Sequence, residues 1–140
     1  MNRFELIEHT ADIGLVAYGS TKEELFENAG EGLFSIITDL NKVSPVEESD
    51  ISITGEDLDD LYIRWLNELI YFWEVNRILG RKFKVSIKDD TSLKAMIYGE
   101  RFDHNKHTIE HGVKAVTYYD FKIEYDHNRK IWTAKVIIDV

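Results

Sequence analysis

DLDDLYIRWLNELIYFWEVN, residues 57–76, is the longest stretch of unbroken periodicity in this chain. Its large apolar side chains recur at spacings of three and four residues, which aligns them on one face of an α-helix: Leu58, Leu61, Tyr62, Trp65, Leu66, Leu69, Phe72 and Trp73. Acidic residues in the first turn and Arg77 just past the far end complement the helix dipole. Five aromatic side chains on one helix are too much apolar surface for a single contact, so the pattern predicts a core helix with sheets packed on more than one side.

The length and composition limit the kind of protein this is. A chain of 140 residues, 44% hydrophobic and 31% charged, fits one globular domain spanning residues 1–140. The absence of cysteine excludes disulfides, thiolate zinc sites and thiol nucleophiles. No apolar run approaches about 18 residues, and residues 1–5 lack the features of an export signal, so we expect a cytoplasmic protein that does not enter membranes.

The net charge of −9 carries functional information. Such a surface repels a phosphate backbone at long range, and the basic residues gather only locally, at Arg77, Arg81, Lys82 and Lys84. We therefore expect no direct binding to nucleic acid. The charge suits a protein partner or a hard cation better.

Around the core helix, the chain is rich in strand patterns. A second helix is predicted from a capping box at Thr21 and Glu24 to about Asp39, with Gly30 and Gly32 indicating close packing. Strands are predicted at 4–7, 13–18, 51–54, 83–88, 92–99, 113–119, 121–125 and 131–140, residues 41–50 are predicted as a loop, and Gly80 is expected to end the segment after the core helix. This is an α+β pattern: two helices packed on mixed, mostly antiparallel β-sheets in a single compact domain.

The first candidate site lies where polar residues meet apolar strands. Asp12 precedes an early strand, and Asp139 ends the last strand beside the α-carboxylate of Val140. A carboxylate at the edge of a sheet is costly unless it is paired, hydrogen-bonded or bound to a cation. Oxygens from these residues could form a binding site for Ca²⁺, Mg²⁺ or Mn²⁺. The alternative interpretation is that Asp12 and Asp139 are two separate, solvated acids at the ends of strands.

Two further candidates have ordinary alternatives. His104, His107, Glu110 and His111 could suit zinc if their segment were helical, but Thr108 and Ile109 favour extended chain and a polar surface loop is the better interpretation. Lys114 lies in an apolar segment, where it either extends to solvent or contacts a phosphate or a partner near the carboxylates. The chain has no phosphate-binding glycine loop, nucleophile elbow or dinucleotide fingerprint.

Five motifs in order over nearly the whole chain resemble the archease family: E-H-T-A-D at 8–12, W-L-N-E-L at 65–69, Gly99 and Glu100 with Asp103 and His107, K-A-V-T-Y at 114–118, and the final Asp139 and Val140. One position departs from the family pattern, because Tyr119 stands where a histidine is usual. That departure puts the role of this side chain in doubt.

The resemblance implies a function that the spacing alone does not. Archeases activate the tRNA-splicing RNA ligase, which works through a histidine-guanylate intermediate, by promoting GTP-dependent guanylylation and multiple turnover, and they are not enzymes themselves. The resemblance also implies a divalent metal ion, Ca²⁺ in a crystal and Mg²⁺ or Mn²⁺ in the cell. Its ligands would be Asp12, Asp139 and a main-chain oxygen of Val140, with His9 orienting Asp12 and Lys114 serving activity.

Two other classes of function stay open at this point. A metal-dependent phosphoester hydrolase would turn over substrate by itself, although His9 is the only evident general base. A general chaperone-like binding module would expose an apolar patch and bind many proteins.

Overall fold

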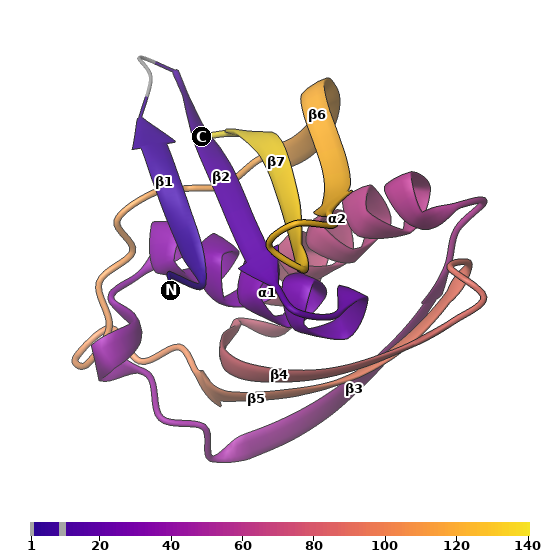
Figure 1. Cartoon of the computed structure of the whole chain (residues 1–140). Helices are drawn as coiled ribbons and strands as arrows, with labels where there is room; N and C mark the ends of the chain where they lie inside the picture. The colour runs from indigo at the N-terminus through magenta and orange to yellow at the C-terminus, as the bar shows by residue number, and fades with distance from the viewer. Residues whose placement is uncertain (1, 9–10) are drawn as a thin grey trace.

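The computed structural model describes residues 2–8 and 11–140, and in it two helices lie between two antiparallel sheets (Figure 1). The elements are β1 (Phe4–Glu8), β2 (Asp12–Gly19), α1 (Lys22–Ile37), β3 (Glu47–Thr54), α2 (Leu58–Asn76), β4 (Ile78–Lys88), β5 (Ser92–Arg101), β6 (Ala115–Asp126) and β7 (Ile131–Asp139), with a short 3-10 turn at Leu40–Lys42. One sheet has the strand order β1-β2-β7-β6 and the other β3-β5-β4. The α+β expectation is confirmed, and all pairings between the described strands are antiparallel.

The core helix α2 has the predicted position and well-defined ends. The side chain of Asp57 accepts a hydrogen bond from the backbone N–H of Asp60 at 2.8 Å, which caps the first turn. At the other end, Arg77 takes the left-handed conformation (φ 56°) and its N–H donates to the carbonyl of Trp73. The prediction that Gly80 ends this segment is wrong: Gly80 lies inside β4, where an added Cβ would come within 2.7 Å of the Phe83 ring.

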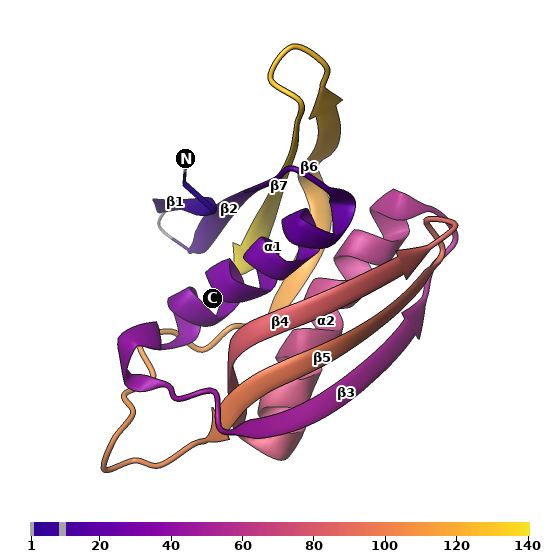
Figure 2. The ribbon, with the colours of Figure 1, turned by 60° about the horizontal axis from the view of Figure 1, so that its bottom comes forward.

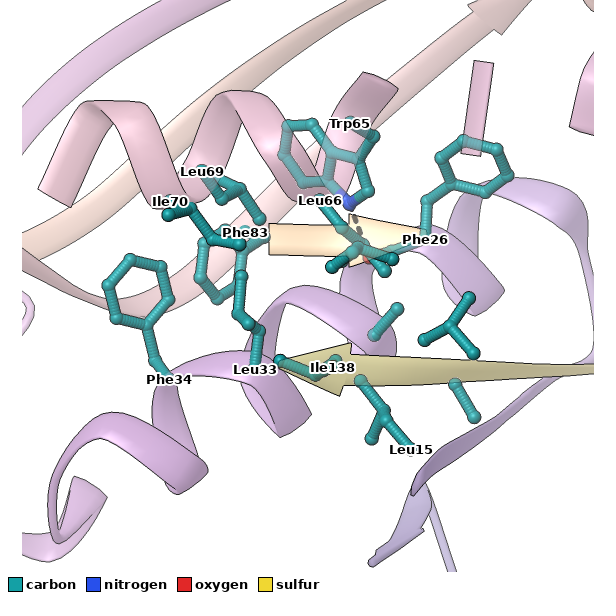
Figure 3. Close-up of a cluster of buried hydrophobic side chains, with 14 of the residues drawn as sticks. Leu15, Phe26, Leu33, Phe34, Trp65, Leu66, Leu69, Ile70, Phe83 and Ile138 are labelled. Atoms are coloured by element: carbon teal, nitrogen blue, oxygen red, sulfur yellow. Dashed lines mark hydrogen bonds between the residues drawn. The ribbon is translucent and has the colours of Figure 1, made fainter. Parts of the chain in front are cut away.

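The core fills the layer between the two sheets (Figure 3). Trp65 of α2 is fully buried, and its indole N–H donates to the carbonyl of Phe26 in α1 at 2.9 Å. Phe83 of β4 packs edge-on against Trp65, and Leu15 of β2 lies on the other side of α1. Sheets therefore pack on two sides of the helix layer, as the aromatic content of α2 predicted.

Helix α1 lies close to the sheet of β2. The Thr21 hydroxyl accepts the N–H of Glu24 at 3.0 Å, and the Glu24 carboxylate accepts the N–H of Ser20 at 2.9 Å, so the predicted capping box is present. A Cβ on Gly32 would lie 2.6 Å from the Leu15 side chain. The glycine therefore permits the close packing that was expected.

Three predicted boundaries are wrong. Strand β4 begins at Ile78, five residues before the strand predicted at 83–88. Residues 47–50 belong to β3 rather than to a loop, and their side chains alternate between half-buried and exposed. Residues 115–126 form one strand, β6, instead of two. In β6, residues 118–121 lie opposite the single residue 136 of β7, and Asp120 is left-handed (φ 54°), so a wide bulge replaces the predicted break.

None of the helices in the described chain is long and apolar enough to cross a membrane.

Candidate functional site

The pairing of β2 with β7 brings together the carboxylates that the sequence singled out. Asp12 and Asp139 are direct cross-strand partners, and Ala115 of β6 pairs with Asp139 from the other side. Residues directly opposite each other in an antiparallel pair project to the same face, with Cβ atoms about 5 Å apart. Figure 1 shows the C-terminus beside the start of β2. We call the two aspartates and the adjacent Val140 the acidic tip.

At the acidic tip Asp12 is half-buried and Asp139 is exposed, but one oxygen of Asp12 is fully buried. Oδ1 of Asp12 is buried and has no hydrogen-bond partner among residues 2–8 and 11–140. Among the residues that the structure describes, the other such atom is the hydroxyl of Tyr62, a neutral group in the core. A buried carboxylate oxygen with a second carboxylate across the strand pair is much costlier than an unpaired hydroxyl, and a cation would offset that cost.

The donor atoms fit a hard divalent cation. The two side-chain carboxylates and a main-chain oxygen of Val140 are all oxygen ligands, which suits Ca²⁺, Mg²⁺ or Mn²⁺. Within the described ranges, no three His, Cys, Asp or Glu side chains converge on one point. A cation at this tip would therefore complete its coordination with main-chain oxygens and water.

Lys114 joins the acidic tip through its main chain. Its N–H donates to the carbonyl of Asp139 at 2.8 Å, while the residue itself is exposed. No hydrogen bond or ion pair in the described part of the chain joins its ammonium group to Asp12 or Asp139. The side chain is thus available to a partner molecule. His9 lies outside the described residues, so its orienting role stays a prediction.

Asn67 is a positioning residue that the sequence reasoning missed. Its side-chain amide donates to the carbonyl of Val116 at 3.0 Å and accepts the N–H of Val116 at 2.9 Å. The Asn67 side chain on α2 thus satisfies both backbone groups of Val116 in β6, as a neighbouring strand would. Val116 lies two residues after Lys114. An amide within the apolar run W-L-N-E-L was the feature that could have identified it, because a half-buried polar group needs partners.

The histidine candidates do not converge. His107 is buried, with Nε2 2.8 Å from a Glu100 carboxylate oxygen and Nδ1 accepting the N–H of Asp103 at 3.0 Å. Because Nδ1 is an acceptor, the proton lies on Nε2 and donates to Glu100. His104 and His111 are exposed, and the segment is not helical. The structure therefore contradicts the zinc arrangement and agrees with a surface loop pinned by one histidine.

Glu100 is the charged residue that holds this loop, because its carboxylate bonds to Ser44, Lys106 and His107. Desolvation opposes its ionisation, but the Lys106 ammonium, the backbone N–H of Ser44 and the His107 ring outweigh it and lower the pKa of Glu100 to about 2. The motif formed by Gly99, Glu100, Asp103 and His107 is thus structural. Gly99 belongs to it because an added Cβ would clash with the backbone carbonyl of Leu79.

The position that departs from the family pattern lies in the bulge of β6. Tyr119 is 77% exposed there. Its neighbour Tyr118 donates to Oδ1 of Asp60 at 3.0 Å, and desolvation together with this bond raises the pKa of Tyr118 to about 12. Tyr118 therefore ties the bulge to the first turn of α2, while Tyr119 is left to solvent.

Comparison with known proteins gives a consistent result. Residues 4–140 match the sequence profile of the Archease protein family (MTH1598/TM1083). The protein archease of Sulfurisphaera tokodaii is 42% identical over 139 residues, which cover 99% of this chain and 100% of the relative. The protein archease of Pyrococcus furiosus is 39% identical over 143 residues, with both chains covered completely.

Two solved structures share the fold. The solution structure of Methanobacterium thermoautotrophicum protein 1598 superposes with a TM-score of 0.85 at 38% identity, and both chains are covered completely. A crystal structure from Thermotoga maritima, described as an archease and possible chaperone, gives a TM-score of 0.62 at 24% identity over 96% of this chain and 94% of that one. The second likeness concerns the fold alone.

Proposed function

Because this chain belongs to the archease family, we propose that it is a non-catalytic protein cofactor that activates the tRNA-splicing RNA ligase. It promotes the GTP-dependent guanylylation of the ligase's active-site histidine and so permits multiple turnover. In that reaction a histidine nitrogen of the ligase forms a bond to the α-phosphorus of GTP, and the bond to the departing pyrophosphate breaks. No side chain of this protein takes part in either bond.

The observation that carries the proposal is the acidic tip. Asp12 and Asp139 lie directly opposite each other, and one oxygen of Asp12 is buried without a partner among the described residues. A divalent cation bound there would supply positive charge near the triphosphate of GTP. The two carboxylates would hold the cation at the end of the sheet, and the N–H of Lys114 donates to the carbonyl of Asp139 and so fixes the main chain there.

The rest of the surface supports a protein partner. The net charge of −9 favours approach to a basic RNA-binding cleft and disfavours binding of RNA itself. The tip would dock near the guanylate site and either place the cation or reshape the pocket so that histidine and triphosphate align. Lys114, which is exposed beside the tip, would contact the ligase or a phosphate.

The test measures guanylylation of the ligase with GTP and limiting metal. Wild-type protein accelerates it, and Asp139→Ala lowers that acceleration by at least about tenfold, as expected for loss of a metal ligand. Glu124→Gln is the matched control, because it removes an exposed carboxylate from β6 of the same sheet, away from the tip. Equal rates with wild type and Asp139→Ala would reject the metal role, and no acceleration by wild type would reject the activator itself.

The two alternatives give different results in simple assays. A hydrolase would turn over nucleotides or phosphoesters without the ligase. A general chaperone, the role suggested by the description of the Thermotoga protein, would suppress aggregation of unrelated unfolded proteins. We expect neither activity from the isolated protein.

A further inference from the structure

Strand β3 offers a free edge on the sheet that does not carry the acidic tip. It is eight residues long and lies at one side of the order β3-β5-β4, with no other strand of the described chain on its outer side (Figure 2). Half of the backbone N–H and C=O groups of an edge strand lack partners in the sheet. Such an edge can accept another strand.

A groove runs along this edge between β3 and α2. Its volume is about 730 Å³, and it is lined by Ser49 and Ile51 from β3 and by Tyr71 and Val75 from α2. Tyr71 is 61% exposed and Val75 is 58% exposed, one helical turn apart. Two large apolar side chains side by side in water form a shelf onto which apolar side chains of an added strand could pack.

The acidic residues of β3 determine which side chains an added strand would carry on its outer face. Ser49 and Ile51 face α2, because their partners in β5 are buried: Ile97 and Ala95. Glu48 and Asp50 alternate with them along β3 and therefore point to the outer face of the sheet. Glu68 of α2 adds a carboxylate to the groove. No cation in the described part of the chain forms an ion pair with Glu48, Asp50 or Glu68.

Arg101, which also lines the groove, is already engaged. Its guanidinium bonds to the carbonyl of Asn76 at 3.2 Å and lies 4.0 Å from Glu47. On the outer face of the sheet, Lys94 of β5 and Lys82 and Lys84 of β4 lie further from the free edge, so the excess negative charge is confined to β3 and the groove beside it.

We propose that the β3 edge binds an extended segment of a partner protein as a fourth strand of this sheet. In that segment Lys or Arg residues alternate with apolar residues. The basic side chains lie across from Glu48 and Asp50 on the outer face, and the apolar side chains pack on Tyr71 and Val75 on the inner face. A second copy of this chain fits poorly, because its own β3 would place carboxylates against carboxylates.

This surface does not depend on the proposed metal or on the ligase. The groove lies on the three-stranded sheet, and the acidic tip lies on the four-stranded sheet. A failure of one proposal therefore leaves the other intact.

The experiment selects from a display library of random twelve-residue peptides on the immobilised full chain. We expect enrichment of peptides in which Lys or Arg alternate with apolar residues. We also expect the amide protons of 47–54 that do not bond to β5 to become protected from exchange when such a peptide binds. Tyr71→Ser and Asp50→Lys, both at exposed positions, should each weaken the peptide Kd at least tenfold.

Two matched controls distinguish peptide binding in this groove from nonspecific binding. Tyr119→Ser removes another highly exposed tyrosine and Glu110→Lys reverses another exposed acid, and neither should change the Kd. The proposal is overturned if no peptide is enriched, if replacing the basic residues of the peptide by Glu leaves binding unchanged, or if Tyr71→Ser and Asp50→Lys bind as wild type does. A dimer that Tyr71→Ser dissolves would also overturn it, because a second copy would then cover the edge.

Discussion

Asp12 combines a buried carboxylate oxygen, which has no hydrogen-bond partner among the residues that the structure describes, with a like charge on the residue across from it. Asp12→Asn removes the repulsion, so we expect the metal-free protein to gain up to about 1 kcal/mol in its free energy of unfolding. The same change removes a ligand, so the rise in Tm on adding Ca²⁺ should disappear. For wild type, a cation at 100 times its Kd should contribute about 2.7 kcal/mol.

Thermal unfolding with and without a chelator measures both effects. Glu124→Gln serves as the control and should keep the full response to Ca²⁺. If Asp12→Asn and wild type respond equally to the cation, Asp12 is not a ligand.

Glu100 should make the stability of the protein depend on pH. Its pKa is lowered from 4.5 to about 2 by the groups around it, so its contribution to stability is complete above about pH 4.5 and is lost as the pH falls toward 2. Glu100→Gln should lower Tm at pH 7, and the difference from wild type should shrink between pH 4.5 and 2. Scanning calorimetry across that range is the measurement. The same change at exposed Glu110 should have little effect at any pH, and a difference in Tm that stays constant with pH would argue against this anchor.

Among single residues, the sequence predicted the carboxylates of the acidic tip but not Asn67. Acids at the ends of apolar strands are conspicuous in one sequence. The bonding of Asn67 depends on where β6 lies beside α2. The role of Tyr119 was left open for a similar reason, because the bulge that exposes it arises from the pairing of β6 with β7.

At the scale of elements, Asn67 links α2 to the strand that leads to the acidic tip. Asn67→Asp keeps an acceptor for the N–H of Val116 but places a second acceptor against its carbonyl. We expect a loss of about 1–3 kcal/mol in the free energy of unfolding. We also expect weaker binding of Ca²⁺, because the start of β6 holds Asp139 through Lys114 and Ala115.

Denaturant unfolding and calorimetric titration with Ca²⁺ measure the two effects separately. Asn76→Asp, at the exposed end of the same helix, is the control: its charge opposes the helix dipole and should cost at most about 1 kcal/mol, and it should leave Ca²⁺ binding unchanged. A variant that is destabilised but binds Ca²⁺ as wild type does would show that Asn67 supports the fold and not the tip.

The elements were predicted most accurately where local sequence features, such as an apolar repeat and capping residues, determine the structure. Helix α2 has the expected ends because its apolar repeat and caps are local. Gly80 was misread because a glycine that permits close packing looks the same in sequence as one that ends a segment. The break expected at 120 is a bulge, and bulges depend on the partner strand.

At the scale of the whole molecule, the net charge of −9 should govern how fast this protein meets a basic partner. If the acidic surface steers encounter with the ligase, the association rate should fall by an order of magnitude or more as the ionic strength rises from about 0.05 to 0.5 M, since the Debye length shrinks. Stopped-flow association at several salt concentrations is the measurement. The dissociation rate should change much less, and an association rate insensitive to salt would contradict steering.

The global arrangement was the part that the sequence predicted least directly. The sequence offered a shared site of Asp12 and Asp139 only as one of two alternatives, and the family resemblance strengthened it, because many strand orders are compatible with the same elements. The pairing of β2 with β7 decides it, and that pairing joins residues more than a hundred positions apart.

The placement of β7 also matters during synthesis on the ribosome. It is synthesised after both β2 and β6, yet it lies between them in the sheet. A nascent chain that stops before residue 131 lacks both Asp139 and the strand that joins β2 to β6. Under the proposed function, only chains translated through β7 could activate the ligase, so products that stop before it would be inactive.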